Sequence, residues 1–187
     1  MSMHVRRSPV STALPFSPTD LKSHLRVSHS EEDYQITNMG KTAAAEIEQF
    51  AQIALLTQTI DVTIFRPQSD RGLRLPVGPV DDQDVPTVTI NGEAFTDFDF
   101  VGGIRPYLWW GEDFYRLTLR RIDIEYLAGF GASTSDVPSD LVQAIMDQTA
   151  LHYGGPRWTP RDSPRRPTWR VSGPGIAGCR YDRPRAG

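Results

Sequence analysis

The sequence predicts an α+β protein: a small helical bundle that carries a β-rich antiparallel insert and is followed by an extended C-terminal tail. Apolar residues recur at helical spacing near the start of the chain and again over 138–153, whereas the period changes to two between 58 and 126. The last 32 residues contain six prolines and four glycines. A segment of that composition cannot form a core of its own.

The N-terminal third predicts a flexible arm and two helices. Residues 1–16 show no periodicity, so we expect an arm without fixed structure. Ser17 followed by Pro18 is typical of an N-cap and a first helical position, which predicts a short helix over about 17–27. A longer helix is predicted over about 30–55, because apolar residues recur there every three or four positions. This stripe consists of Ile36, Met39, Ala43, Ile47, Phe50, Ala51 and Ala54.

The middle of the chain, about 58–126, predicts a small antiparallel sheet or barrel-like insert. β-Branched and aromatic residues dominate the segments TIDVTIF, GLRLPV, PTVTI, EAFTDFDF and YRLTLRRIDIEY. Asn91-Gly92, between two of these segments, is a strong hairpin signal. In the last segment the apolar positions change from odd to even numbers at Arg120-Arg121, which predicts a bulge or bend within one strand.

The closing helix is predicted over about 138–153, with Gly154-Gly155 as its C-terminal cap. Asp140, Gln143 and Asp147 lie on one narrow stripe, and most remaining positions are apolar. We therefore expect this helix to be buried on several sides. The chain divides into the arm (1–16), a folded body (17–155) and a basic Pro/Gly-rich tail (156–187).

Charge is distributed unevenly along the chain. The tail holds eight arginines and two aspartates, a net charge of +6, and the other 155 residues hold 12 basic and 21 acidic groups, a net charge of −9. The 39% hydrophobic and 23% charged composition is typical of soluble globular proteins. No apolar run is long enough to span a bilayer, and the N-terminus lacks the apolar core of a signal peptide. We expect the protein to be made and kept in the cytoplasm.

The stretch from Tyr126 to Gly155 has the outline of a phosphate-binding loop, since a strand leads through a Gly-rich turn into a helix. Gly129 and Gly131 are, however, followed by ASTSDVP. That segment has neither the third glycine of a dinucleotide fingerprint nor the lysine of a nucleoside-triphosphate loop. We interpret Gly129, Gly131 and Pro138 as a structural turn that sets the angle between the insert and the closing helix. Ser135 or Asp136 is the expected helix cap.

The sequence offers no constellation for catalysis, cofactor binding or metal binding. Four histidines, at positions 4, 24, 29 and 152, lie outside any known metal-ligand spacing. The acidic cluster of Asp81, Asp82 and Asp84 lacks the pattern of a calcium loop. The single cysteine, Cys179, excludes an internal disulfide and a cysteine-based metal site. We expect no enzymatic activity, with an enzyme whose site lies in the aromatic insert as an alternative.

The tail mixes guanidinium groups with aromatic rings, a mixture that binds phosphates and bases and also dominates protein–protein hot spots. Its candidate partner-binding residues are Arg157, Trp158, Arg161, Arg165, Arg166, Trp169, Arg170, Tyr181 and Arg183. Because the body is acidic, we favour a protein partner, with a nucleic-acid-binding accessory protein of DNA packaging as the alternative. The aromatic run Tyr107, Trp109 and Trp110 is a second candidate assembly surface.

A longer pattern joins these observations: Y-x-A-G-F-G, a short polar spacer, V-P-x-x-L-x-x-A-I and a helix that ends in an aromatic residue, Tyr126 to Tyr153. This pattern resembles the small head-tail connector (adaptor) proteins of long-tailed bacteriophages and of phage-derived gene transfer agents. The order of the surrounding elements is similar to that family as well. The resemblance covers about residues 17–155, which we name the connector domain.

The resemblance implies a structural subunit rather than an enzyme, without cofactor or membrane. Family members form a ring, commonly of twelve copies, between the portal of a DNA-filled capsid and the next neck or tail component, a stopper or tail terminator. The resemblance also implies that helices line the ring and that DNA passes through the lumen without specific binding. It implies further that the tail from Arg157 onward docks on the portal. The site of action would be the neck of a virion or phage-like particle assembled in the bacterial cytoplasm. Ring closure requires two different faces of each subunit to meet.

Overall fold

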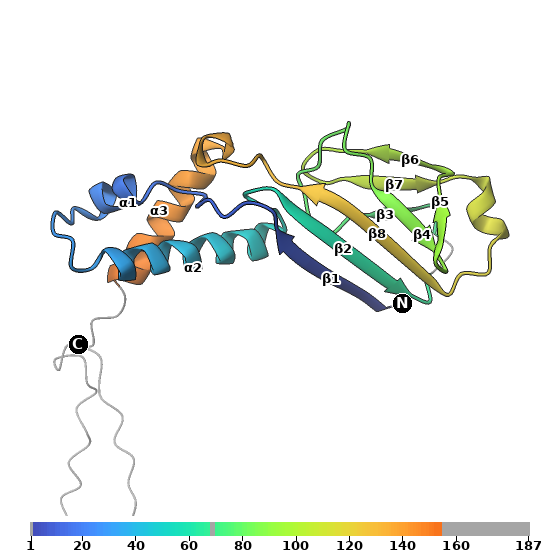
Figure 1. Ribbon diagram of the computed structural model, residues 1–187, viewed down its shortest axis with the longest axis horizontal. Helices are drawn as coiled ribbons and strands as arrows, with labels where there is room; N and C mark the ends of the chain where they lie inside the picture. The colour runs from blue at the N-terminus through green and yellow to red at the C-terminus, as the bar shows by residue number, and fades with distance from the viewer. Residues whose placement is uncertain (1, 68–69, 155–187) are drawn as a thin grey trace, which may run out of the picture. The chain divides into compact units, whose positions relative to one another are not determined.

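The computed structural model describes residues 2–67 and 70–154, in which helices and strands occupy separate regions (Figure 1). The helices are α1 (Pro18–Leu25), α2 (Asp33–Ala51) and α3 (Ser139–Gly154), with 3₁₀ helices η1 (Glu112–Arg116) and η2 (Thr134–Asp136). The strands are β1 (Ser2–Pro9), β2 (Gln58–Phe65), β3 (Gly72–Arg74), β4 (Thr87–Ile90), β5 (Glu93–Phe95), β6 (Phe98–Val101), β7 (Tyr107–Trp110) and β8 (Arg121–Ala128). The predicted α+β class is confirmed. The tail over 156–187 lies outside the described residues.

The strands form two antiparallel sheets. The five-stranded sheet has the order β1-β2-β8-β4-β5 and the three-stranded sheet the order β3-β7-β6. At the centre of the larger sheet, β2 and β8 pair over their full length, from Gln58 opposite Ala128 to Phe65 opposite Arg121. Asn91 and Gly92 adopt positive φ in the turn between β4 and β5, so the hairpin signal is confirmed.

The two sheets share one apolar core. Alternate residues of β2 and β8 are buried, and the residues between them face outward. Trp110 of β7 enters the same core and stacks on Phe114 of η1, with ring centroids 4.5 Å apart. The buried Tyr126 hydroxyl donates to the Val77 carbonyl at 3.1 Å and accepts from the Val77 N–H at 3.2 Å, so this polar atom is satisfied.

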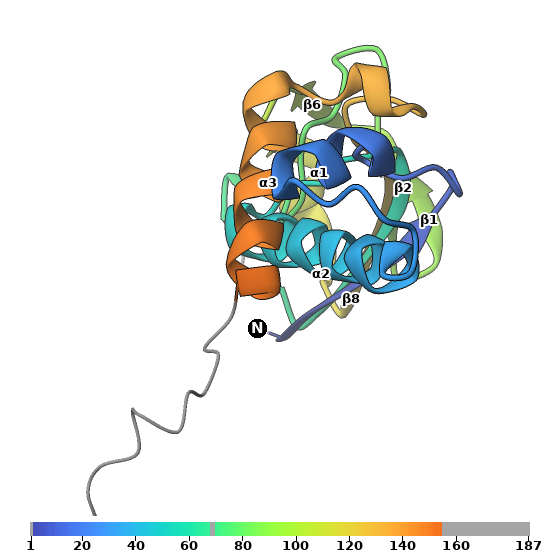
Figure 2. The same cartoon turned by 90° about the vertical axis from the view of Figure 1, so that its left-hand side faces the viewer.

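The three helices pack around a second apolar core, with α1 and α3 beside α2 (Figure 2). Its largest fully buried side chains are Phe16, Leu21, Ile36, Leu55 and Ile145. Ser17 Oγ accepts from the Asp20 N–H at 3.3 Å and Pro18 opens α1, as the sequence predicts. None of the helices in the described part of the chain combines the length and apolar character that a membrane crossing requires.

The prediction of a flexible arm over 1–16 is wrong for residues 2–9, which form the edge strand β1. This strand pairs antiparallel with β2, from Ser2 opposite Phe65 to Pro9 opposite Gln58. An ion pair of 2.9 Å joins Arg6 of β1 to Asp61 of β2. The pairing with β2 holds residues 2–9 in place. Their own sequence has little of the alternation that marks a strand, so the sequence alone does not predict β1.

Three other expectations also need correction. The helix predicted to reach residue 55 ends at Ala51, because Gln52 adopts a left-handed φ of 56°. The segment predicted as one bent strand is instead η1, a loop and β8, so the change of phase at Arg120-Arg121 marks the start of a strand. Finally, α3 is fully buried at Ile145 and Thr149 alone, and its Leu151 is 69% exposed. The apolar surface of α3 exceeds what the described chain covers.

Candidate functional site

The histidines and carboxylates of the described residues are separated into structural pairs. No cluster of three or more His, Cys, Asp or Glu side chains that could hold a metal occurs within residues 2–67 and 70–154. His24 of α1 lies 3.2 Å from Asp147 of α3, and His152 of α3 lies 3.0 Å from Glu46 of α2. These pairs join helices to one another. They do not place a nucleophile beside a base.

Glu46 of α2 contacts two polar side chains of α3. Its Oε2 atom accepts a hydrogen bond from the Gln148 amide at 2.7 Å and lies 3.0 Å from His152 Nε2. The hydrogen bonds from Gln148 and His152 hold the pKa of Glu46 below its ordinary value, because both favour the charged carboxylate. The carboxylate is therefore a stabilising contact between two helices and stays ionised at neutral pH.

The Gly-rich turn between β8 and α3 is held by hydrogen bonds within the protein. The Gly129 N–H donates to the Pro79 carbonyl at 2.9 Å, and the Thr57 N–H donates to the Gly131 carbonyl at 2.8 Å. Asp136 accepts from the Ser133 N–H at 2.9 Å in a capping box. These Ser133 hydrogen bonds hold the pKa of Asp136 below its ordinary value. A carboxylate at the turn disfavours a phosphate there, and the Gly129 N–H is already used.

Both glycines have backbone conformations that other residues rarely adopt, with φ of 141° at Gly129 and 156° at Gly131. A Cβ atom on Gly129 would lie 2.6 Å from backbone atoms of Leu56 and Thr57. Pro138 follows η2, and its carbonyl accepts from the Leu141 N–H at 3.0 Å at the start of α3. Ser135 and Asp136 are the two expected caps of this helix. Asp136 instead closes η2 together with Ser133, and the Ser135 hydroxyl lies 2.8 Å from the Ser133 hydroxyl. The three predicted turn residues lie together between the sheet and α3.

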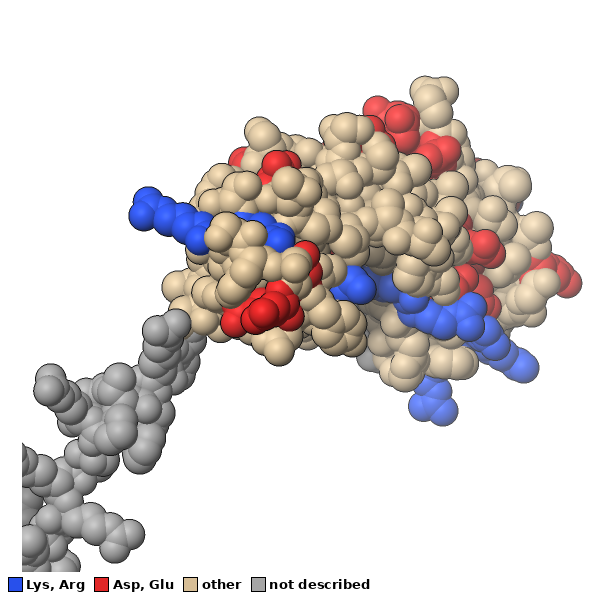
Figure 3. Space-filling model, turned by 60° about the vertical axis from the view of Figure 1, so that its left-hand side comes forward, with Lys and Arg blue, Asp and Glu red and all other residues tan. Residues whose placement is uncertain are grey.

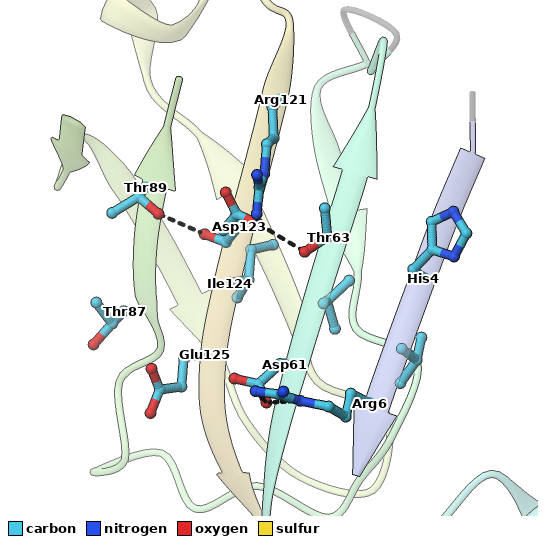
Figure 4. A pocket seen from close by; sticks show the side chains of 12 residues that line it. His4, Arg6, Asp61, Thr63, Thr87, Thr89, Arg121, Asp123, Ile124 and Glu125 are labelled. Carbon is cyan, nitrogen blue, oxygen red and sulfur yellow. Dashed lines mark hydrogen bonds and ion pairs between the residues drawn. The ribbon is translucent and has the colours of Figure 1, made fainter. Parts of the chain in front are cut away.

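On the face shown in Figure 3, many basic side chains gather in a band toward the lower right, and acidic side chains lie in several separate groups. A second charged surface is the outward face of the five-stranded sheet (Figure 4), which borders a groove of about 580 Å³. There the Asp123 carboxylate accepts from Thr63 Oγ1 at 2.7 Å and from the Arg121 guanidinium at 2.7 Å. The Arg6–Asp61 pair lies beside them. Because these charges are already paired, the groove offers a small ligand few free partners.

The aromatic run that the sequence singled out is a strand with alternating faces. Leu108 and Trp110 are buried, whereas Trp109 is 48% exposed and packs against Tyr107 with ring centroids 4.8 Å apart. Part of the run therefore belongs to the core, and its use as an assembly surface stays a prediction that the exposed Trp109 would carry. The predicted partner-binding residues from Arg157 to Arg183 lie outside the described residues.

The largest apolar exposure was not foreseen from the sequence. Phe50, at the end of α2, is 94% exposed, and it borders a groove of about 500 Å³ between the helices and the three-stranded sheet. Ile104, Phe130 and Leu141 also line that groove. Sequence periodicity places Phe50 on the apolar stripe of α2 but cannot show where neighbouring elements stop covering the stripe.

Comparison with solved structures gives the same fold in particles of one kind. A chain of the virion of a native gene transfer agent (GTA) particle has a TM-score of 0.67 and 23% sequence identity, with 85% of this chain and 87% of that chain covered. A chain of the neck of an empty GTA particle computed with C6 symmetry has a TM-score of 0.62 and 24% identity, covering 83% and 85%. A chain of the neck of a native GTA particle computed with C12 symmetry has a TM-score of 0.61 and 21% identity, covering 95% and 88%.

No protein-family model matches the chain, and no curated protein matches it. At these identities the solved structures show that the fold is shared. The chain has a fold that occurs in the necks of gene transfer agents.

Proposed function

We propose that the protein is a structural head-tail connector (adaptor) subunit in the neck of a gene transfer agent or tailed-phage particle. The observation that carries the proposal is the match in fold over most of the chain to neck chains of such particles. The sequence pattern from Tyr126 to Tyr153 points to the same role independently.

In this proposal the subunits form a ring, with twelve copies as the expected number. Similarity to a chain from a neck computed with C12 symmetry supports that number. The incompletely covered α3 supports association as well, because apolar surface of this kind is buried when subunits meet. The helical bundle of α1, α2 and α3 would line the ring, and the β part would extend from it.

DNA passes through the lumen of the proposed ring without specific binding. The net charge of −9 outside the tail supports this, since an acidic wall repels the DNA backbone and allows it to slide.

The remaining partners are the portal protein and the next neck or tail component, a stopper or tail terminator. We assign portal docking to the tail from Arg157 onward, because its arginines and tryptophans are typical of interface hot spots. The ring would be built onto particles in the bacterial cytoplasm, and its final location would be the particle neck.

The tail assignment is tested by deleting residues 156–187 and measuring binding to the portal protein of the same particle. The truncated protein should keep the circular dichroism spectrum and unfolding midpoint of the full chain but lose portal binding. A truncated protein that still binds portal would show that the docking element lies elsewhere. If the truncated protein kept portal binding but lost a tight, salt-dependent DNA binding that the full chain has, the result would favour a DNA-packaging accessory protein.

A further inference from the structure

Phe50 is the most exposed large apolar side chain of the described residues. It lies on the same face of α2 as Ile36 and Ala43, because seven and fourteen residues correspond to about two and four helical turns. Ile36 and Ala43 are buried in the helical core. Phe50 continues their face to the end of the helix, where nothing in the described chain covers it.

The opposite face of α2 borders an apolar groove of about 320 Å³, which we name the α2 groove. The connection from β1 to α1 runs along α2 and forms its other wall (Figure 1). Ala44, Leu55 and Leu56 are buried at its floor, and Ala45 is exposed at its edge. A cavity of about 150 Å³ can accept a benzene ring, so the α2 groove is large enough for one aromatic side chain.

The charged groups that line the α2 groove either have partners within the chain or face water, so the groove suits an apolar occupant. Glu48 Oε1 accepts from the Leu55 N–H at 2.8 Å and from the Gln58 amide at 2.9 Å. Its carboxylate is therefore engaged inside the chain, and Lys41 is exposed at the rim, where its ammonium stays in water. An aromatic ring that entered the groove would leave no buried charge without a partner.

The two features lie on different faces of one rigid helix. At 100° per residue, Phe50 is about 120–180° around α2 from the groove residues Lys41, Ala44, Ala45 and Glu48. Each subunit of a closed ring meets its two neighbours through different faces on nearly opposite sides. An isologous dimer would need Phe50 and the α2 groove on one shared surface, which their separation around α2 disfavours.

We propose that Phe50 of one copy inserts into the α2 groove of the next copy around the ring. This inference rests on the proposed ring and specifies its subunit contact. A second copy is the occupant favoured by the structure, because the exposed ring and the groove occur on the same chain in the placement that repeated head-to-tail contacts need. Every subunit then supplies one aromatic side chain and receives one.

Paired cysteines test this contact. In a Cys179→Ser background, Ala51→Cys and Ala45→Cys are combined in one chain, so that Phe50 stays in place. This chain is mixed with the portal protein of the same particle and treated with a short bis-maleimide. Both positions are exposed, so neither substitution should disturb folding. We expect a ladder of multimers on a denaturing gel. A mixture of the two single-cysteine chains should give dimers only, since each chain can then form one link.

The control pairs Ala45→Cys with Val101→Cys, which is exposed on β6 of the three-stranded sheet and should give no ladder. Phe50→Ala should also weaken subunit association by about tenfold or more, because a buried aromatic contact is lost. A ring-sized mass by light scattering with no cross-link between positions 51 and 45 would overturn the contact and leave the ring standing. Absence of both the mass and the cross-link would overturn the ring as well. Dimers from Ala51→Cys alone would indicate an isologous contact and refute the proposal.

Discussion

Replacing Gly129 by alanine should strongly destabilise the connector domain. At φ of 141° a residue with a side chain carries backbone strain of about 1–3 kcal/mol. The new Cβ would also lie 2.6 Å from Leu56 C and O and from Thr57 N. These backbone atoms cannot move freely, because the Thr57 N–H is hydrogen-bonded to the Gly131 carbonyl. Overpacking of this kind costs about another 1–3 kcal/mol.

The expected loss in the free energy of unfolding is therefore about 2–6 kcal/mol. Urea unfolding followed by circular dichroism measures it. Gly154→Ala is the matched control, since a Cβ there meets no atom within 4 Å and alanine favours a helix. Gly103→Ala isolates the strain, because Gly103 has φ of 93° but open space around its Cβ position. A Gly129→Ala protein as stable as the Gly154→Ala protein would refute the account of this turn.

Three further changes test other parts of the structure. Gly131→Val should lower the free energy of unfolding by about 1–3 kcal/mol through backbone strain, and by more if the new side chain displaces Asp136 from its capping box. A lower urea midpoint of unfolding would show this loss. Tyr126→Phe should cost about 1–3 kcal/mol, because both backbone groups of Val77 lose a buried partner; an unchanged urea midpoint would contradict this. The free energy of unfolding should fall as the pH drops below 4.5, the ordinary pKa of Glu46, and through the lower pKa that Glu46 has in the folded protein. A group with a depressed pKa stabilises the fold only while it is ionised. In the Glu46→Gln variant the free energy of unfolding, measured at several pH values, should decrease less at acid pH.

Elements with strong local signals were predictable from the sequence. The hairpin at Asn91-Gly92 follows from two residues that tolerate positive φ. The start of α1 follows from Ser17 and Pro18, which supply a side-chain cap and a preset φ. In both cases a few adjacent residues determine the conformation.

Elements that depend on distant partners were not predictable. The strand β1 exists because all eight of its residues pair with β2, which lies about fifty to sixty positions further along the chain. Its own sequence is largely polar and basic. The loop after η1 has the alternation of a strand but does not form one. Phe114 of η1 stacks on Trp110 in the core, and this contact directs the chain before the loop away from the sheet.

The candidate site divides in the same way. Gly129, Gly131 and Pro138 were identified because glycine and proline restrict or permit particular backbone angles. Phe50 was placed on the correct stripe of α2, but its exposure depends on how far the neighbouring helices extend. A pattern within one helix carries no information about that distance.

The central claim is that the chain assembles into a ring at the portal. The most direct test is the mass of the purified protein by light scattering, alone and after mixing with its portal protein, at low and high salt. A ring of twelve chains of 21.0 kDa would add about 250 kDa to the portal. A defined assembly of that size at both salt concentrations is the result we predict. A protein that stays monomeric with portal and shifts only with DNA at low salt would contradict the connector account.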